Sequence, residues 1–196
     1  MDTATHYDLL IEENNDPFRD PPALREYMCR WDGEQFLEAL QLAKNKEILE
    51  IGIGTGRLAV KVAPHCGRLT GIDISPKTIQ RAKDNLKECA NITFVCDDFT
   101  VYNFNQTFDV IYSSLTMMHF KDKAQVISKI AALLNDGGIF CLSIDKSQNQ
   151  YIDMENRKIK IYPDTLDTIL PLINAAAMSV SDVLETENAY IIVSGK

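Results

Sequence analysis

Residues 47–145 alternate short apolar runs with amphipathic segments, and no other feature of the chain constrains its fold as strongly. A strand that reaches its neighbour through a single helix forms a crossover connection, which makes the two strands parallel. The sequence therefore predicts an α/β fold with a doubly wound, mostly parallel sheet. The predicted strands span residues 47–51, 68–73, 91–96, 108–114 and 137–145.

The C-terminal part is less regular. A helix is expected to start after Asp164, and Pro171 should kink or split it because proline lacks the backbone N–H and clashes with the preceding turn. The runs at 182–186 and 189–194 predict a hairpin that closes the sheet. The segment 156–163 alternates charged and apolar residues, which is typical of an edge strand or of a loop on the substrate side.

The length of 196 residues indicates one main domain with at most a small appendage. Residues 11–22 are rich in acidic and amide side chains and in proline, which predicts a surface loop, and residues 23–43 are more helical. We therefore expect residues 1–44 to form a helical N-terminal extension or lid. Residues 45–196 would form the main domain.

Composition excludes several partners. Twenty Lys and Arg against 28 Asp and Glu give a net charge of −8, which would repel a phosphate backbone, so no nucleic-acid partner is expected. The chain has no run of 18 apolar residues and no secretory leader, which predicts a cytoplasmic protein without a membrane partner. Its five cysteines form no CxxC or zinc-site spacing, so we expect reduced thiols and no metal. No motif indicates an oligomeric state.

Three alternate glycines, Gly52, Gly54 and Gly56, follow the first predicted strand. Glycine lets the backbone approach a ligand closely, and ligands of open parallel sheets bind beyond the carboxyl ends of the strands. Asp73 ends the second strand and is placed to accept both hydroxyl groups of a ribose. Asp73 could instead cap the next helix, but Ser75 already suits that position. The combination predicts a nucleoside-containing cofactor.

The glycine spacing bears on which cofactor that is. The dinucleotide fingerprint GxGxxG needs a third glycine where this chain has Arg57, and the spacing here is GxGxG. A bulky side chain at that position would hold the helix away from the strand and crowd a pyrophosphate. The pattern therefore disfavours a nicotinamide-dependent oxidoreductase, which remains the competing enzyme class.

Five motifs resemble, in order and spacing, those of the class I S-adenosylmethionine-dependent methyltransferases. They are EILEIGIGTGRLA (47–59), GIDIS (71–75), FVCDDF (94–99), FDVIYSSLTMMHF (108–120) and LNDGGIFCLSI (134–144). The resemblance implies a Rossmann-like methyltransferase fold with seven strands in the order 3-2-1-4-5-7-6, the seventh being antiparallel. It also implies S-adenosylmethionine as cofactor and S-adenosylhomocysteine as its product.

The resemblance further implies roles for individual residues in one cofactor site. Glu50 and the glycine backbone would surround the methionine part, and Asp73 would hold the ribose. Asp97 or Asp98 would bind the exocyclic amine of adenine, and the carbonyl of Ser113 would meet the methionine amino group. The complete set of cofactor candidates is Glu50, Gly52, Gly54, Gly56, Asp73, Ile74, Asp97, Asp98 and Ser113.

Methyl transfer from a sulfonium depends mainly on positioning, so few catalytic residues are required. His119, after the fourth strand, and Asp145, at the end of the fifth, are the candidates to orient or deprotonate an acceptor; structural hydrogen bonds are the alternative for both. Tyr7, Arg30 and Trp31 are the lid candidates in the N-terminal extension, although Trp31 could equally anchor the core.

The leading functional hypothesis is a methyltransferase that acts on a small-molecule acceptor. The chain has no separate substrate domain and no basic groove, which favours a small neutral or cationic acceptor. Two alternatives stay open. One is the nicotinamide-dependent oxidoreductase, and the other is a catalytically inactive module that binds an adenosyl cofactor.

Overall fold

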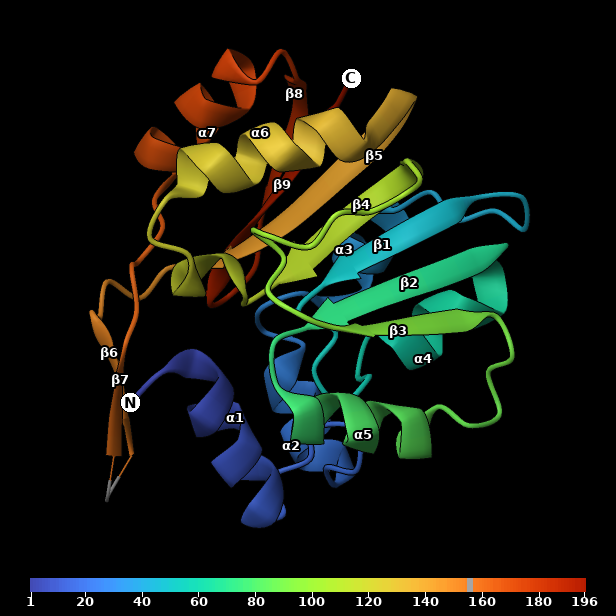
Figure 1. The fold of residues 1–196 in the computed structure, drawn as a ribbon. Coiled ribbons are helices and arrows are strands. Elements are labelled where there is room, and N and C mark those ends of the chain that lie inside the picture. The colour runs from blue at the N-terminus through green and yellow to red at the C-terminus, as the bar shows by residue number, and fades with distance from the viewer. Residues whose placement is uncertain (155–156) are drawn as a thin grey trace.

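A seven-stranded sheet forms the centre of the computed structural model, which describes residues 1–154 and 157–196 (Figure 1). Its order is β3-β2-β1-β4-β5-β9-β8, and β9 runs antiparallel to both of its neighbours. The predicted α/β fold, the strand order implied by the resemblance and the closing hairpin are all confirmed. The strands are β1 (Glu47–Ile51), β2 (Arg68–Asp73), β3 (Ile92–Cys96), β4 (Phe108–Ser114), β5 (Leu134–Asp145), β8 (Ser179–Glu185) and β9 (Ala189–Gly195).

Helices cover both faces of this sheet, and a small separate hairpin lies beside the N-terminal helix (Figure 1). The helices are α1 (Thr3–Glu12), α2 (Pro22–Met28), α3 (Gly33–Ala39), α4 (Ala59–Val62), α5 (Pro76–Asn85), α6 (Lys123–Leu133) and α7 (Leu166–Ala175), with short 3₁₀ turns η1 (Ala63–His65) and η2 (Met117–His119). The hairpin consists of β6 (Tyr151–Met154) and β7 (Arg157–Lys160).

Strand alternation divides the core into two layers. In β4, Val110 and Tyr112 point toward the layer of α3, α4 and α5, whereas Ile111 points toward the layer of α6 and α7. In β1, Leu49 and Ile51 join the α6 and α7 layer. All five side chains are at most 1% exposed, so these central strands are buried on both faces, as expected for strands in a parallel sheet.

The sequence predictions for helices α5 and α7 had different outcomes. The hydroxyl of Ser75 accepts a hydrogen bond from the Thr78 N–H, and Pro76 takes the first helical position of α5, as predicted. The predicted split at Pro171 is wrong, because α7 continues through it. Pro171 lies on the exposed face of α7, and the Asp167 carbonyl that its missing N–H would have bonded also belongs to an exposed residue.

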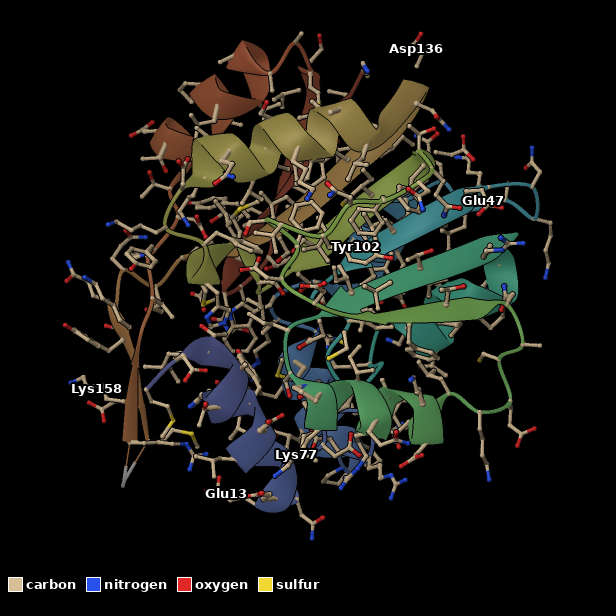
Figure 2. The ribbon with its side chains drawn as sticks, in the orientation of Figure 1. Glu13, Glu47, Lys77, Tyr102, Asp136 and Lys158 are labelled. Atoms are coloured by element: carbon tan, nitrogen blue, oxygen red, sulfur yellow. The ribbon has the colours of Figure 1, made fainter. Side chains whose placement is uncertain are left out.

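The N-terminal helix α1 packs against α5. The carboxylate of Asp8 accepts hydrogen bonds from the Ser75 hydroxyl (2.6 Å) and the Lys77 backbone N–H (3.0 Å), and Lys77 also pairs with Glu12. Glu13 and Lys77 both lie near the C-terminal end of α1 (Figure 2). Glu13 forms an ion pair with Arg157 of β7, so α1 is connected to the sheet helices on one side and to the small hairpin on the other.

The segment 156–163 is only partly covered by this description, because residue 156 lies outside the described residues. Residues 157–160 form strand β7, which pairs with β6 rather than with an edge of the main sheet. The prediction of a strand is therefore confirmed for residues 157–160, and this strand belongs to a small separate sheet. Among the described residues, no helix combines the length and the apolar character needed to cross a membrane.

Candidate functional site

A cavity of about 360 Å³ opens at the carboxyl ends of β1, β2 and β4, beneath α1. The glycine turn after β1 forms its floor, and the segments after β2, β3 and β4 form its walls. Of the nine predicted cofactor residues, seven line this cavity and two do not. The seven are Glu50, Gly52, Gly54, Asp73, Ile74, Asp97 and Asp98.

Gly56 and Ser113 are the two that stand apart from the cavity. A Cβ at Gly56 would lie 2.5 Å from Cδ1 of Leu86, so this glycine lets the turn pack against the end of α5. Ser113 is buried, and its hydroxyl donates to the Ile51 carbonyl (3.1 Å). Its neighbour Ser114 lines the cavity instead.

Only glycine fits at position 52, because the loop after β4 lies close to it. It adopts φ +77°, and a Cβ there would lie 2.1 Å from Oγ1 of Thr116, which also lines the cavity. Any larger residue would displace this loop. The glycine turn and the loop after β4 are therefore held in contact across the cavity floor.

Asp73 holds the glycine turn and the start of α5 in place. Its Oδ2 accepts the Gly54 N–H and its Oδ1 accepts the Ser75 N–H, both at 3.0 Å. Burial raises the pKa of the Asp73 carboxyl, while these backbone donors oppose the rise. The Ile74 N–H also opposes the rise. A carboxylate has about four acceptor positions, so Asp73 keeps acceptor capacity for a ligand hydroxyl.

Glu50 lies fully buried below the glycine turn. Desolvation raises its pKa to about 8, although the Tyr112 hydroxyl donates to it at 2.7 Å and the nearby Arg57 charge also opposes the rise. Arg57 itself forms a two-contact ion pair with the buried Asp32. The Ser114 hydroxyl also donates to Asp32 (3.0 Å), which connects β4 to the segment before α3.

Asp32 was not among the residues predicted from the sequence. Asp32 lies in an irregular segment without a motif, and no spacing rule relates it to Arg57, so no local signal could have found it. For Arg57, the sequence predicted only that its bulk would crowd a pyrophosphate. Burial opposes the charge of the Arg57 guanidinium, but the Asp32 carboxylate raises its pKa overall. The guanidinium is directed to Asp32, so this bulky side chain fits here without blocking the glycine turn.

The two adjacent acids after β3 differ in their partners. Oδ1 of Asp98 accepts both the N–H and the hydroxyl of Thr100, each at 2.7 Å, and so caps the following turn. Oδ1 of Asp97 accepts only the N–H of Asp98 (2.7 Å) among the contacts of the described residues. Phe99, beside them, also lines the cavity. The carboxylate of Asp97 therefore has more free acceptor capacity than that of Asp98.

Tyr7 and His119 meet at the far side of the cavity. The Tyr7 hydroxyl and Nε2 of His119 are 2.8 Å apart, and both residues line the cavity. Burial lowers the pKa of His119 to about 4, assisted by the charges of His6 and Lys123. Nδ1 of His119 is buried without a hydrogen-bond partner among the described residues. Burial also raises the pKa of Tyr7.

A second cavity of about 410 Å³ adjoins the first and shares Tyr7, Met28 and Leu115 with it. Trp31 and Asp145 both line this second cavity, and the indole N–H donates to the carboxylate at 2.9 Å. Among the three lid candidates, Tyr7 and Trp31 thus face cavities. Arg30 lines neither cavity and pairs with Glu187 at 3.0 Å on the surface.

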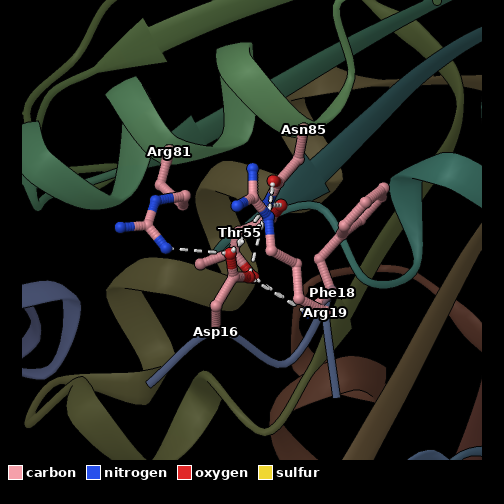
Figure 3. Close-up of polar contacts among 6 residues, drawn as sticks. All are labelled: Asp16, Phe18, Arg19, Thr55, Arg81 and Asn85. Atoms are coloured by element: carbon pink, nitrogen blue, oxygen red, sulfur yellow. Dashed lines mark hydrogen bonds and ion pairs between the residues drawn. The ribbon is translucent and has the colours of Figure 1, made fainter. Parts of the chain in front are cut away.

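The loop after α1 is fixed to α5 and to the glycine turn by Asp16 (Figure 3). This buried carboxylate accepts from Arg81 (3.1 Å) and from Asn85 (3.2 Å to each oxygen). Asn85 also donates to the Thr55 carbonyl (3.1 Å), and the Phe18 N–H approaches Asp16 and Thr55. Sequence patterns predicted only a surface loop here, because the partners lie far along the chain.

Residues 48–138 match the family model described as a methyltransferase domain. The match covers the glycine turn and the walls of the first cavity. This region, just under half of the chain, is thus similar to methyltransferase domains. Within the described parts of the chain, no group of three or more His, Cys, Asp or Glu side chains could hold a metal ion.

Curated relatives match over the same region. The chain is 30% identical over 121 residues to a ubiquinone biosynthesis O-methyltransferase of Coxiella burnetii, covering 60% of this chain and 52% of that protein. It is 30% identical over 102 residues to a malonyl-[acyl-carrier protein] O-methyltransferase of Ilyobacter polytropus, covering 51% of this chain and 38% of that one. The chain thus spans about half or less of the length of these relatives.

Solved structures match nearly the whole fold. The N-methyltransferase NodS of Bradyrhizobium japonicum, in complex with S-adenosyl-L-homocysteine, has a TM-score of 0.70 at 21% identity and covers 91% of this chain and 90% of its own. The [4+2]-cyclase SpnF has a TM-score of 0.78 at 15% identity, with 98% and 95% covered. At such identities the likeness concerns the fold, which can support more than one reaction.

Proposed function

We propose that this chain is an S-adenosylmethionine-dependent methyltransferase that acts on a small-molecule acceptor. The observation that carries the proposal is the pair of adjoining cavities that share Tyr7, Met28 and Leu115. The first cavity contains the glycine turn and Asp73, and would hold the cofactor. The second would hold the acceptor, so that donor and acceptor meet at the shared residues.

The residues of the first cavity fit an adenosyl sulfonium. Asp73 faces the cavity and keeps acceptor capacity for a ribose hydroxyl beside its backbone donors. Asp97 keeps free acceptor capacity for an exocyclic amine, and Gly54 has no atom within 4 Å of the Cβ it lacks, so the floor is open there. When bound, the cofactor supplies an electrophilic methyl group. A volume of about 360 Å³ lies within the range of about 300 to 1,000 Å³ that is usual for ligand pockets.

The remaining residues would bind, orient and exclude water. α1 covers the first cavity and contributes Tyr7 at the junction, which supports the role of the N-terminal extension as a lid. His119 would orient the Tyr7 hydroxyl, since a depressed pKa keeps the imidazole neutral at neutral pH and leaves one ring nitrogen able to accept a hydrogen bond. Arg30 has no part in this proposal, because its guanidinium pairs with Glu187 at the surface.

Calorimetry with S-adenosylmethionine, S-adenosylhomocysteine and NAD tests the cofactor assignment. We expect both sulfur compounds to bind and NAD not to bind. Asp73→Asn should weaken S-adenosylhomocysteine by about 1–3 kcal/mol, because ribose hydroxyls lose a charged partner. Asp84→Asn, at an exposed position of α5, is the matched control and should leave affinity unchanged. Binding of NAD alone would favour the oxidoreductase and overturn the proposal.

A catalytically inactive module would bind the same cofactor, so binding does not test turnover. Incubation with methyl-labelled S-adenosylmethionine and a small-molecule extract does. We expect label in an extract compound, and less of it with the Asp73→Asn variant at a cofactor concentration that does not saturate that variant. Tight binding with no label transferred to any extract would favour the inactive module. A product that lacks the label, formed only with the cofactor present, would favour a different reaction on this fold.

A further inference from the structure

We propose that the second cavity binds acceptors that carry a protonated amine beside an aromatic or aliphatic body, with Asp145 as the partner of the ammonium. This inference rests on the proposed function and adds the substrate class. It follows from three observations: the walls of the cavity, the pairing of its acids and the way Asp145 is held.

Part of the wall of the second cavity is apolar and aromatic. Tyr7, Trp31, Met118 and Ile161 are among its lining residues, and they can pack against a hydrocarbon body. The faces of tyrosine and tryptophan rings also attract an ammonium, by roughly 0.5–1 kcal/mol at exposed sites and more where water is excluded.

The charged side chains that line this cavity all have the same sign. They are Asp145, Asp153 and Asp164, and no Lys, Arg or His is among the described residues that line it. Asp164 is neutralised by Lys123 (2.6 Å), and Asp153 by Lys158 (2.9 Å), which is labelled at the outer hairpin in Figure 2. A carboxylate or phosphate acceptor would therefore meet only acids or neutral groups.

Asp145 is the one of these three acids that forms no ion pair with a basic side chain of the described residues. No basic side chain of the described part of the chain lies within 4.0 Å of its carboxylate. The Trp31 indole N–H donates to Oδ2 (2.9 Å) and the Ser147 N–H to Oδ1 (2.6 Å), which fixes the carboxylate in one orientation. Neutral donors leave its charge uncompensated, and each oxygen keeps a lone pair for an ammonium.

The position of Asp145 connects this anchor to the junction of the two cavities. Asp145 ends β5, which lies beside β4, and Leu115 directly follows β4. Trp31 is held in turn by its own carbonyl, which accepts from the Ser143 hydroxyl of β5 (2.6 Å). An acceptor held by its ammonium at Asp145 can therefore extend its body along the shared residues toward the first cavity.

The test compares three probes of one shape and different charge: 2-phenylethylamine, 2-phenylethanol and phenylacetate. Each is titrated into the full-length protein saturated with S-adenosylhomocysteine. We expect the amine to bind about tenfold more tightly than the alcohol, the equivalent of one well-placed charged pair, and phenylacetate to be weakest. Asp145→Asn should abolish the preference of the amine over the alcohol.

Asp153→Asn is the matched control, because it also removes one negative charge from a residue that lines the cavity. It should keep the preference for the amine, since Asp153 is paired with Lys158. Equal binding of the three probes, absence of amine binding at millimolar concentration, or an unchanged preference in Asp145→Asn would each overturn the inference. Failure of S-adenosylhomocysteine itself to bind would instead overturn the proposed function, so the two failures are distinguishable.

Discussion

The Tyr7 hydroxyl lies 2.8 Å from Nε2 of His119, although 112 residues separate them in the chain. Their rings meet edge to face, with centroids 5.4 Å apart. The contact joins α1 to the segment after β4, where the two cavities adjoin. Burial lowers the pKa of His119 to about 4, so this contact is made by a neutral imidazole above that pH.

The first prediction follows from this shift. A histidine with a depressed native pKa contributes stability that is present above the unfolded pKa of about 6.5 and lost as the pH falls through about 4. We expect His119→Gln to remove up to about 3 kcal/mol of this pH dependence between pH 6.5 and 4. Urea unfolding of both proteins across that range measures it. Parallel stability curves for the two proteins would contradict the shift.

Glu50 leads to a second prediction of opposite sign. Its native pKa of about 8 lies above the usual value of 4.5, so its contribution is fully present below pH 4.5 and lost as the pH rises through about 8. The unsubstituted protein should lose on the order of 4 kcal/mol of unfolding free energy between pH 4.5 and 8. Glu50→Gln places a group that stays neutral beside Tyr112, so this loss should be absent in the variant.

The same unfolding series from pH 4.5 to 9 tests this second prediction. The comparison should use Glu88→Gln, which changes an exposed glutamate and should leave the curve as in the unsubstituted protein. If Glu50→Gln becomes less stable in parallel at every pH, the carboxyl is ionised in the native state and the argument for its protonation is wrong.

Sequence patterns predicted the sheet well because strand identity depends on local apolar periodicity and on the motif order. They predicted less well wherever a side chain finds a distant partner. Asp32 pairs with Arg57 from an irregular segment, and Arg30 pairs with Glu187 at the other end of the chain. Neither contact has a local signature. One residue of register also separates Ser113, buried against β1, from Ser114, which lines the cavity.

A third prediction concerns the two acids that the motif left undistinguished. Oδ1 of Asp98 accepts two hydrogen bonds from Thr100, whereas the Asp97 carboxylate accepts one hydrogen bond among the described residues, from the Asp98 N–H. Asp97 therefore has more free acceptor capacity for a ligand in the cavity. Asp97→Asn should weaken S-adenosylhomocysteine by about tenfold, since a charged acceptor for the adenine amine becomes neutral. Asp98→Asn should leave that affinity within about twofold and the unfolding free energy nearly unchanged, because the amide oxygen can still accept both hydrogen bonds from Thr100. The reverse ranking in calorimetry would assign adenine to Asp98.

The fourth prediction concerns the Asp16 contacts that hold the loop at 13–20, which follows α1. Burial opposes ionisation of this carboxyl, yet hydrogen bonds from Thr55, Arg81 and Asn85 lower its pKa overall. Asp16→Asn keeps the shape but loses the ion pair with Arg81, so the loop at 13–20 should open more often while the sheet stays closed.

Amide hydrogen exchange in this variant should rise at residues 13–20 and at the glycine turn, and stay unchanged in β4 and β5. We expect the unfolding free energy to fall by about 1–3 kcal/mol, because Arg81 is left beside an uncharged partner. Arg19→Gln is the control, since Arg19 is mostly exposed where it meets Asp16 and its pair should contribute under about 1 kcal/mol. Uniformly faster exchange across the whole chain would mean that Asp16 supports the global fold rather than the loop at 13–20 alone.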